Sequence, residues 1–352
     1  ILGDFLNSNL VAVLDSFNGL YGNLNLGVAA TSNPTYPEFM AVKRARTSVL
    51  FAGANDGMLH GFKDSRLTPA ASDDGREVFA YVPRAVYPNL EKLTDKTYGS
   101  SALPHQYFVD GPLREADAYV KAPGAGSASW RNYLVGTLGA GGRAVYGLDV
   151  TDLAGLGTNT VRWEISDTTS GVGADMGYIL APVKIGVLDN GRWVAIFGNG
   201  FSSNNGNATL FVVDLEKAAD NDSTAVQTLN VGVSGGNGLG GVTLIHDGDG
   251  KITTIYAGDL KGQMWKFAYN ASATSKFEVS GGTAMFSATD GGGSAQPITS
   301  SPVVYNHLQG GRIVIFGTGK LFETADALTT SVQTVYAVWD KPADTFSRPM
   351  VR

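Results

Sequence analysis

Short apolar and aromatic runs separated by glycine-rich turns are the main pattern along this chain. The clearest unit has an apolar run that ends in glycine, a turn with a second glycine, and an alternating aromatic and aliphatic run that often ends in aspartate. Runs of this kind predict β-strands joined in hairpins. Five copies of the unit occur, at residues 49–64, 133–149, 193–214, 254–267 and 313–340.

The spacing of these copies indicates a repeat architecture. Successive first glycines lie 83, 62, 60 and 59 residues apart; they are Gly53, Gly136, Gly198, Gly258 and Gly317. A long, nearly constant period made of strands is typical of β-propeller blades with decorated loops, in which small twisted sheets pack radially and bury each other's faces. We therefore predict an all-β propeller with long decorated loops that forms a single domain over residues 1–352.

Several local features can be predicted from the same pattern. We expect further strands at residues 77–83, 161–165, 177–185 and 301–305, loops at 23–37, 98–104 and 289–296, and a helical turn near 84–93. The first glycine of each unit is expected to provide a positive φ for its hairpin, with Asn55-Asp56-Gly57 as a strong example of such a turn. Aromatic residues of the second run are expected to pack between blades; they are Phe62, Tyr146, Phe211, Trp265 and Tyr336.

Composition narrows the possible chemistry. The absence of cysteine excludes disulfides, thiolate metal sites and cysteine nucleophiles. A net charge of −6, without a long block of lysine or arginine, argues against nucleic acid as a partner. No apolar stretch is long enough to span a membrane, and no signal peptide opens the chain. Because the chain begins at Ile1, we expect a fragment of a longer secreted protein.

Nine phrases, in order along the chain, carry a resemblance to a known family. They are LGDFLNS (2–8), FAGANDGMLHGF (51–62), EVFAYVP (77–83), YFVDG (107–111), LGAGGRAVYGLDVTD (138–152), DMGY (175–178), WVAIFGNGF (193–201), YAGDLKGQMWKF (256–267) and IFGTGKLFE (315–323). Together they resemble the C-terminal domain of the PilY/PilC family of type IV pilus tip adhesins and biogenesis factors. The resemblance implies a modified seven-bladed β-propeller of quinoprotein-like architecture.

The same resemblance implies a function without catalysis. Such a module lies outside the cell, at the pilus tip or on the outer-membrane surface of a Gram-negative bacterium. It promotes pilus extension by opposing retraction, and supports twitching motility, attachment and virulence. The partners implied are minor pilins or the major pilin, together with a host or surface receptor, and the module itself is expected to be a monomer.

Calcium is the one cofactor that the resemblance implies. Family members carry a short calcium loop before the YAGD phrase, and here that stretch is residues 245–253. Asp247, Asp249, the Lys251 carbonyl and Thr253 stand at ligand positions, but Ile245 and Thr253 replace expected acidic residues. Because calcium favours several carboxylate ligands, affinity should be low. The alternative is that this stretch is only a polar hairpin tip.

Other motifs give no catalytic centre. His60, His105, His246 and His307 are not spaced as metal ligands, and we interpret them as surface or hydrogen-bonded strand residues. The glycines of residues 139–142 lack the Lys-Ser/Thr of a phosphate loop, and no GxSxG elbow occurs.

The sequence is compatible with two functions. The first is an adhesion and assembly module, whose contact surface we place at the Ser/Asn-rich residues 202–207 and near Tyr21, Tyr36 and Phe39. The alternative is a quinone-dependent propeller dehydrogenase. It has less support because the chain has no cysteine pair and its five tryptophans occur in differing strand contexts.

Overall fold

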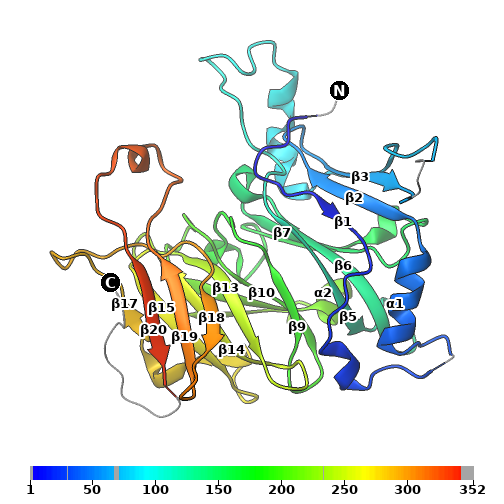
Figure 1. Cartoon of the computed structure of the whole chain (residues 1–352). Coiled ribbons are helices and arrows are strands. Elements are labelled where there is room, and N and C mark those ends of the chain that lie inside the picture. The colour runs from blue at the N-terminus through cyan, green and yellow to red at the C-terminus, as the bar shows by residue number, and fades with distance from the viewer. Residues whose placement is uncertain (1–2, 30, 67–70, 233, 342–352) are drawn as a thin grey trace.

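Five antiparallel sheets follow one another along the chain in the computed structural model, which describes residues 3–29, 31–66, 71–232 and 234–341 (Figure 1). The first contains β1 (Val11–Ala12), β2 (Ser48–Gly53), β3 (Leu59–Asp64) and β4 (Glu77–Tyr81). The second contains β5 (Leu113–Val120), β6 (Ser129–Thr137), β7 (Ala144–Asp149) and β8 (Val161–Ser166). The third contains β9 (Lys184–Val187), β10 (Trp193–Gly198), β11 (Thr209–Asp214) and β12 (Val226–Asn230).

The last two sheets continue this up-and-down order. The fourth contains β13 (Leu239–His246), β14 (Ile252–Asp259), β15 (Gln263–Tyr269) and β16 (Phe277–Val279), with β17 (Phe286–Ser287) also paired to β15. The fifth contains β18 (Val303–Asn306), β19 (Arg312–Gly317) and β20 (Val335–Asp340). Each of the five sequence repeats forms the second and third strands of one sheet, which confirms the predicted repeat unit.

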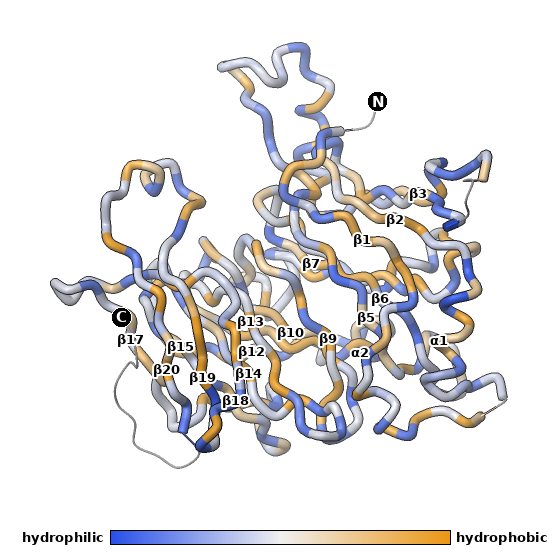
Figure 2. The backbone as a smooth tube through the Cα atoms, viewed as in Figure 1, coloured by the Kyte–Doolittle hydropathy of each residue, from blue (hydrophilic) through white to orange (hydrophobic). Residues whose placement is uncertain are grey.

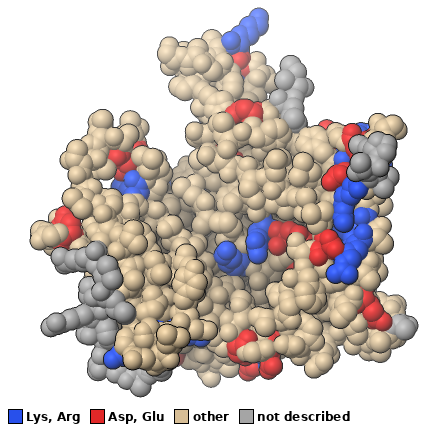
Figure 3. Space-filling view, in the orientation of Figure 1, with Lys and Arg blue, Asp and Glu red and all other residues tan. Residues whose placement is uncertain are grey.

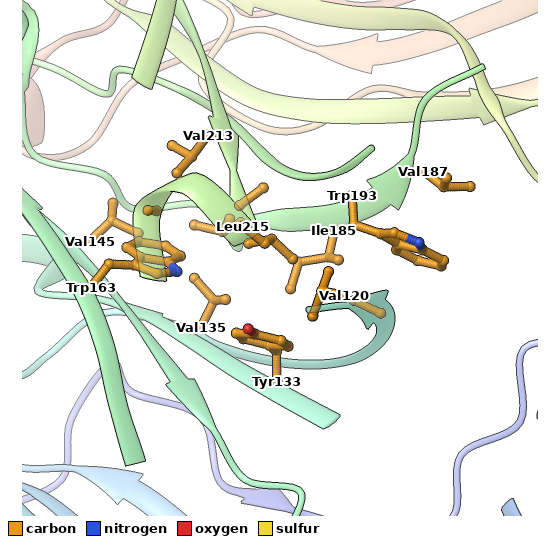
Figure 4. Close-up of a cluster of buried hydrophobic side chains, with 14 of the residues drawn as sticks. Val120, Tyr133, Val135, Val145, Trp163, Ile185, Val187, Trp193, Val213 and Leu215 are labelled. Carbon is orange, nitrogen blue, oxygen red and sulfur yellow. The ribbon is translucent and has the colours of Figure 1, made fainter. Parts of the chain in front are cut away.

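The sheets pack face to face through four buried apolar clusters, one between each successive pair of sheets. Strand β10 shows how one sheet contributes side chains to two clusters. Alternate side chains of a strand point to opposite faces; Trp193, Ala195 and Phe197 enter the cluster shared with the second sheet, whereas Val194 and Ile196 enter the cluster shared with the fourth. Figure 4 shows the cluster between the second and third sheets. Figure 2 shows hydrophobic residues concentrated along the strands.

This packing confirms the all-β, propeller-like prediction. The described residues form five sheets, so the expected number of seven blades and the quinoprotein-like architecture are not confirmed. Four of the five predicted packing aromatics are buried, at Tyr146, Phe211, Trp265 and Tyr336. The fifth, Phe62, is half-buried and stacks on His60 with 5.9 Å between ring centroids.

The first glycines of the repeats correct one prediction. None of the five, all within the described residues, has a positive φ. The positive φ belongs to the second glycine of the turn, as at Gly57, where φ is 95°. At Gly258 the missing side chain allows close packing, because a Cβ there would lie 2.2 Å from Cγ2 of Ile298, in the segment that leads into the next sheet. The five positions are not equivalent: a Cβ on Gly136 would meet Tyr146 of its own sheet, and one on Gly317 would meet no described atom within 4 Å.

Hydrogen bonds at the turn between second and third strands join each sheet to the next. In every case a residue of the turn, or the last residue of the strand before it, bonds to the following sheet or to the segment that leads into it. The bonds are Phe108 N to Asn55 Oδ1 (2.9 Å), Thr137 Oγ1 to Ile179 O (2.8 Å), Leu239 N to Asn199 Oδ1 (2.9 Å) and Ile298 N to Asp259 O (2.9 Å). Each successive pair of sheets is therefore connected both by an apolar cluster and by a hydrogen bond.

One helix was missing from the predictions. The C-terminal part of the expected loop at residues 23–37 begins α1 (Tyr36–Ala45). Thr35 and Glu38 form its capping box, and Pro37 lies in its first turn, so the start signals were present in the sequence. The expected helical turn near residues 84–93 is confirmed as η2 (Arg84–Thr94).

The remaining helical segments are short and lie in the connections. They are η1 (Tyr21–Leu24), η3 (Gly139–Gly141), η4 (Thr158–Thr160), η5 (Gly173–Asp175), α2 (Leu215–Ala219), η6 (Ser280–Gly282) and η7 (Thr324–Leu328). Among the helices that the structure describes, none has the length and apolar character needed to cross a lipid bilayer.

Candidate functional site

The stretch predicted to bind calcium forms the hairpin turn between β13 and β14. Oδ1 of Asp247 accepts hydrogen bonds from the backbone N–H groups of Asp249 (3.0 Å) and Lys251 (2.9 Å). The Asp247 N–H in turn donates to the Lys251 carbonyl at 2.9 Å, and Gly250 has a φ of 84°. The carboxylate and the carbonyl predicted as ligands therefore close the turn.

Thr253 and the Lys251 side chain bond to other protein groups, and Asp249 points to solvent. The Lys251 ammonium lies 2.9 Å from Oδ1 of Asp189, and this hydrogen bond raises its pKa. Oγ1 of Thr253 donates to the carbonyl of Ile245 at 3.2 Å, and the Ile245 side chain packs against the cluster between the last two sheets. Asp249 is exposed.

The donor set does not provide the oxygen cage that calcium favours. Calcium takes about six to eight oxygen ligands, usually several carboxylates. The turn offers two carboxylates and holds a lysine ammonium, and the part of the chain that the structure describes contains no group of three or more His, Cys, Asp or Glu residues that could hold a metal. The turn geometry favours the alternative of a polar hairpin tip, and calcium binding stays a prediction.

A buried charge cluster lies between α1 and the second sheet. Nζ of Lys43, which is only 1% exposed, lies 2.8 Å from both Oε1 of Glu115 and Oδ1 of Asp117. Asn132 Nδ2 donates to the same two oxygens at 2.9 and 3.0 Å, and Tyr36 donates its hydroxyl to Asp117 at 2.9 Å. Burial raises the pKa of Asp117, so its ionised form depends on the Lys43 cation.

Arg46 completes this cluster from the end of α1. Its Nη2 donates to Oδ1 of Asn132, and its Nη1 donates to the carbonyl of Thr151 at 2.8 Å. Two cations and two carboxylates thus share one network, so its formal charges balance. Buried ions of this kind are tolerated when they are paired and hydrogen-bonded.

A large cavity, the central cavity, lies where the first strands of four sheets meet. Strands β1, β5, β9 and β13 line it, and its volume is about 830 Å³. Glu115 and Asp117 of the buried cluster are part of its wall, together with Arg114, Lys184 and His246. Figure 3 shows a hollow in the middle of this face, with blue lysine or arginine atoms and red carboxylate atoms beside it.

Arg114 and Lys184 differ from the other charges of this cavity. Arg114 is exposed and Lys184 is half-buried, and neither forms an ion pair with a carboxylate of the described residues. Burial, together with the nearby charge of Arg114, lowers the pKa of Lys184. Neither residue was among the predicted site residues, because residues 113–120 mix charged with apolar side chains and were not predicted as a strand.

The predicted contact surface is partly wrong. Tyr21, Tyr36 and Phe39, expected to be exposed, are buried and pack around Trp130, with ring centroids 5.7, 4.6 and 6.4 Å from it. Aromatic residues flanked by polar ones resemble a surface patch in a sequence, but α1 and η1 turn these rings onto the second sheet. They form part of the core.

The Ser/Asn-rich residues 202–207 lie where the second and third sheets meet. Asn204 accepts a hydrogen bond from Nη1 of Arg143 at 2.7 Å, and Asn205 donates to Oδ1 of Asp175 at 2.8 Å. Both asparagines remain exposed, so a contact role for this loop stays a prediction.

His60 and His105 occupy the kinds of position that were expected, a hydrogen-bonded strand and the surface, whereas His246 and His307 are half-buried. His60 is buried, with Nδ1 2.5 Å from Glu77 and Nε2 3.0 Å from Asp56. His105 lies 3.1 Å from Asp4, His307 contacts Trp339 with tilted rings whose centroids are 4.0 Å apart, and His246 lines the central cavity.

Successive twisted sheets that pack face to face around a central cavity define a β-propeller class of domain. Residues 2–348 match the family model described as the PilY1 beta-propeller domain. The chain therefore belongs to the PilY1 β-propeller family, and the resemblance drawn from its phrases is confirmed.

Named relatives and a solved structure agree with this assignment. The chain is 37% identical over 362 residues to "Type IV pilus biogenesis factor PilY1" of Pseudomonas aeruginosa PAO1, covering 97% of this chain and 29% of that protein. It is 34% identical over 355 residues to a PilY1 homolog of Xylella fastidiosa Temecula1, covering 96% of this chain and 22% of the homolog. The crystal structure of the Pseudomonas aeruginosa PilY1 C-terminal domain matches with a TM-score of 0.73 and 33% identity, covering 95% of this chain and 64% of that one.

Proposed function

We propose that this chain is a noncatalytic module of a type IV pilus biogenesis factor. The observation that carries the proposal is the 37% identity over 97% of the chain to a protein named for that role. The chain spans only 29% of the length of that protein, so the role of the whole protein is transferred as part of the proposal. In this role the module acts at the pilus tip or cell surface, favours extension by opposing retraction, and supports attachment and twitching motility.

The architecture supports a binding role. The inner sheets bury both faces against neighbours, so their contact with partners falls to the connecting loops and to the central cavity. Loops held on a rigid scaffold are where binding residues are usually found. The proposed partners are minor pilins or the major pilin, and a host or surface receptor.

The alternative, a quinone-dependent dehydrogenase, has less support. The tryptophans, which would form a recurring docking motif in such an enzyme, have different environments: Trp265 donates to Asp259 at 2.9 Å, whereas Trp339 donates to the carbonyl of Gly310 at 3.0 Å. The relatives are named for pilus biogenesis and not for an enzymatic reaction. Absorbance after incubation with the quinone separates the two functions, since a stoichiometric chromophore would support the enzyme.

A pull-down with purified minor pilins tests the proposed function. The chain is immobilised, each minor pilin and the major pilin is applied separately, and an unrelated β-propeller of similar charge is the matched control. We expect retention of at least one pilin by this chain and none by the control. Equal retention by the control, or none of any pilin by either this chain or the full-length protein, would contradict the proposal.

A further inference from the structure

The central cavity contains two cations whose charge is not balanced by the surrounding residues. Lys43 is ion-paired with Glu115 and Asp117, and Arg46 joins their network through Asn132, so the formal charges of the buried cluster already cancel. Arg114 and Lys184 remain, and neither pairs with a carboxylate of the described residues. The cavity therefore carries two positive charges beyond its internal balance.

A positive charge on half-buried Lys184 is costly without an anion beside it, and the exposed Arg114 adds a like charge nearby. Charges with restricted access to water are usually paired with an opposite charge. The attraction between two opposite charges becomes stronger when water is displaced from around them. The lowered pKa of Lys184 is consistent with this, because burial and Arg114 both disfavour its charged form. A carboxylate placed between the two side chains would relieve both effects.

The walls of the cavity also favour an occupant larger than an inorganic ion. Its volume, about 830 Å³, is within the range of about 300–1,000 Å³ that ligand pockets occupy. Leu10 and Phe17 lie on its lining with 62% and 59% of their surface exposed. An occupant that covers these side chains needs apolar groups next to its anionic group.

Backbone groups point to a peptide. Strands β1, β5, β9 and β13 each lie at the edge of their sheets and all line the cavity. Edge strands present backbone N–H and C=O groups that an extended peptide can use. Cations, exposed apolar side chains and strand edges thus occur together at one place.

We propose that the central cavity binds an acidic peptide segment, with Arg114 and Lys184 holding a carboxylate and Leu10 and Phe17 contacting apolar side chains beside it. Arg114 supplies a fork of donors suited to a carboxylate, and Lys184 a point charge. This inference does not depend on the pilus role, because the site is defined by its charge and shape. If the cavity does not bind an acidic peptide, the proposed binding of pilins elsewhere on the module is not contradicted.

Fluorescence anisotropy with a labelled synthetic peptide that alternates glutamate and leucine tests the proposal. The matched probe replaces every glutamate by glutamine. We expect the acidic peptide to bind at least about tenfold more tightly, and its affinity to fall with added salt. Arg114→Gln and Lys184→Gln should each weaken binding about tenfold, and the double variant should weaken it further.

The control is the double variant Arg84→Gln/Lys96→Gln, which removes the same charge from exposed positions outside the cavity. It should bind the acidic peptide as the unchanged chain does. Equal loss in both double variants, or equal affinity for the two peptides, would overturn the proposal. So would displacement of the peptide by inorganic phosphate at equal concentration, since the cavity would then accept any small anion.

Folding of the variants is checked by thermal unfolding. Because no carboxylate of the described residues pairs with Lys184, Lys184→Gln should keep or raise the melting temperature in the absence of peptide. A variant that unfolds at room temperature would show that Lys184 is a structural partner, and would count against the proposal. With peptide present, the melting temperature of the unchanged chain should rise through binding to the folded state.

Discussion

Nζ of Lys43 lies 2.8 Å from Oδ1 of Asp117, which joins α1 to β5 across 74 residues of sequence. Both side chains are almost fully buried, and Glu115 and Asn132 share their hydrogen bonds. The pair therefore holds α1 against the wall of the central cavity.

Lys43→Met should destabilise the domain strongly. The substitution keeps the volume of the side chain but leaves Asp117 and Glu115 buried without their shared cation, which typically costs about 3–5 kcal/mol. The measurement is the free energy of unfolding from urea denaturation. Arg44→Met is the matched control, because Arg44 pairs with Asp15 with its own side chain 62% exposed; it should cost less than about 1 kcal/mol. Equal effects would show that the buried pair contributes little.

Asn199→Ala should loosen the join between the third and fourth sheets. Its Oδ1 accepts from the N–H groups of Thr209 and Leu239, and its Nδ2 donates to two carbonyls, all at a fully buried position. Loss of four hydrogen bonds should cost about 2–4 kcal/mol in urea denaturation. Asn190→Ala, in an exposed turn, should cost less than about 1 kcal/mol. Similar costs for the two variants would contradict the role assigned to Asn199.

Two glycines at the same repeat position should respond differently to alanine. A Cβ on Gly258 would lie 2.2 Å from Ile298, whereas one on Gly317 would have no neighbour within 4 Å among the described residues. Gly258→Ala should therefore lower the free energy of unfolding by about 1–3 kcal/mol through overpacking, and Gly317→Ala should be neutral or slightly stabilising.

A second substitution tests the assigned cause. Ile298→Gly removes both side-chain atoms that the new Cβ would meet, Cγ2 at 2.2 Å and Cβ at 2.4 Å, so it should cost less in the Gly258→Ala background than in the unchanged chain. Simple addition of the two costs in a double-mutant cycle would mean that the clash lies elsewhere.

Stability should depend on the protonation of His60. The hydrogen bond with Asp56 raises the pKa of His60 above its ordinary value of 6.5, with a further contribution from Glu77, while burial acts in the opposite direction. Because the pKa is raised in the folded state, this contribution is fully present below the unfolded pKa and is lost as pH rises through the folded pKa. The pKa of Asp56 is lowered from 3.8, so its carboxylate remains ionised in this window.

His60→Gln measures this contribution. The difference in free energy of unfolding between the unchanged chain and the variant should be larger at about pH 5.5 than at about pH 9. Glu77→Gln, which removes one carboxylate partner, should reduce the pH dependence without abolishing it. A difference that stays constant with pH would show that the two carboxylates do not act on the histidine charge.

Calcium should bind weakly to this chain. Calorimetric titration of chelated protein should give an affinity weaker than micromolar or no heat, because the turn offers two carboxylates and an ammonium group. If heat is observed, Asp247→Ala and Asp249→Ala should remove it. Tight binding that survives both substitutions would place the ion elsewhere in the chain.

The repeats, the strands within them and the family could be predicted from local sequence. Alternation in β10 and glycine-rich turns such as Asn55-Asp56-Gly57 depend on neighbours along the chain, and that information is present in the sequence itself. The capping box of Thr35 and Glu38 was equally local and was overlooked.

Only the tertiary structure decided which polar residues meet. Lys43 and Asp117, or Arg114 and Lys184, come from different elements, and their separation in sequence says nothing about their distance in space. The burial of Tyr36, in α1, likewise depends on Trp130 of the second sheet. Local propensity determines a strand and its alternation, whereas the packing of one sheet on the next determines which side chains share a cavity, and with it the balance of charge there.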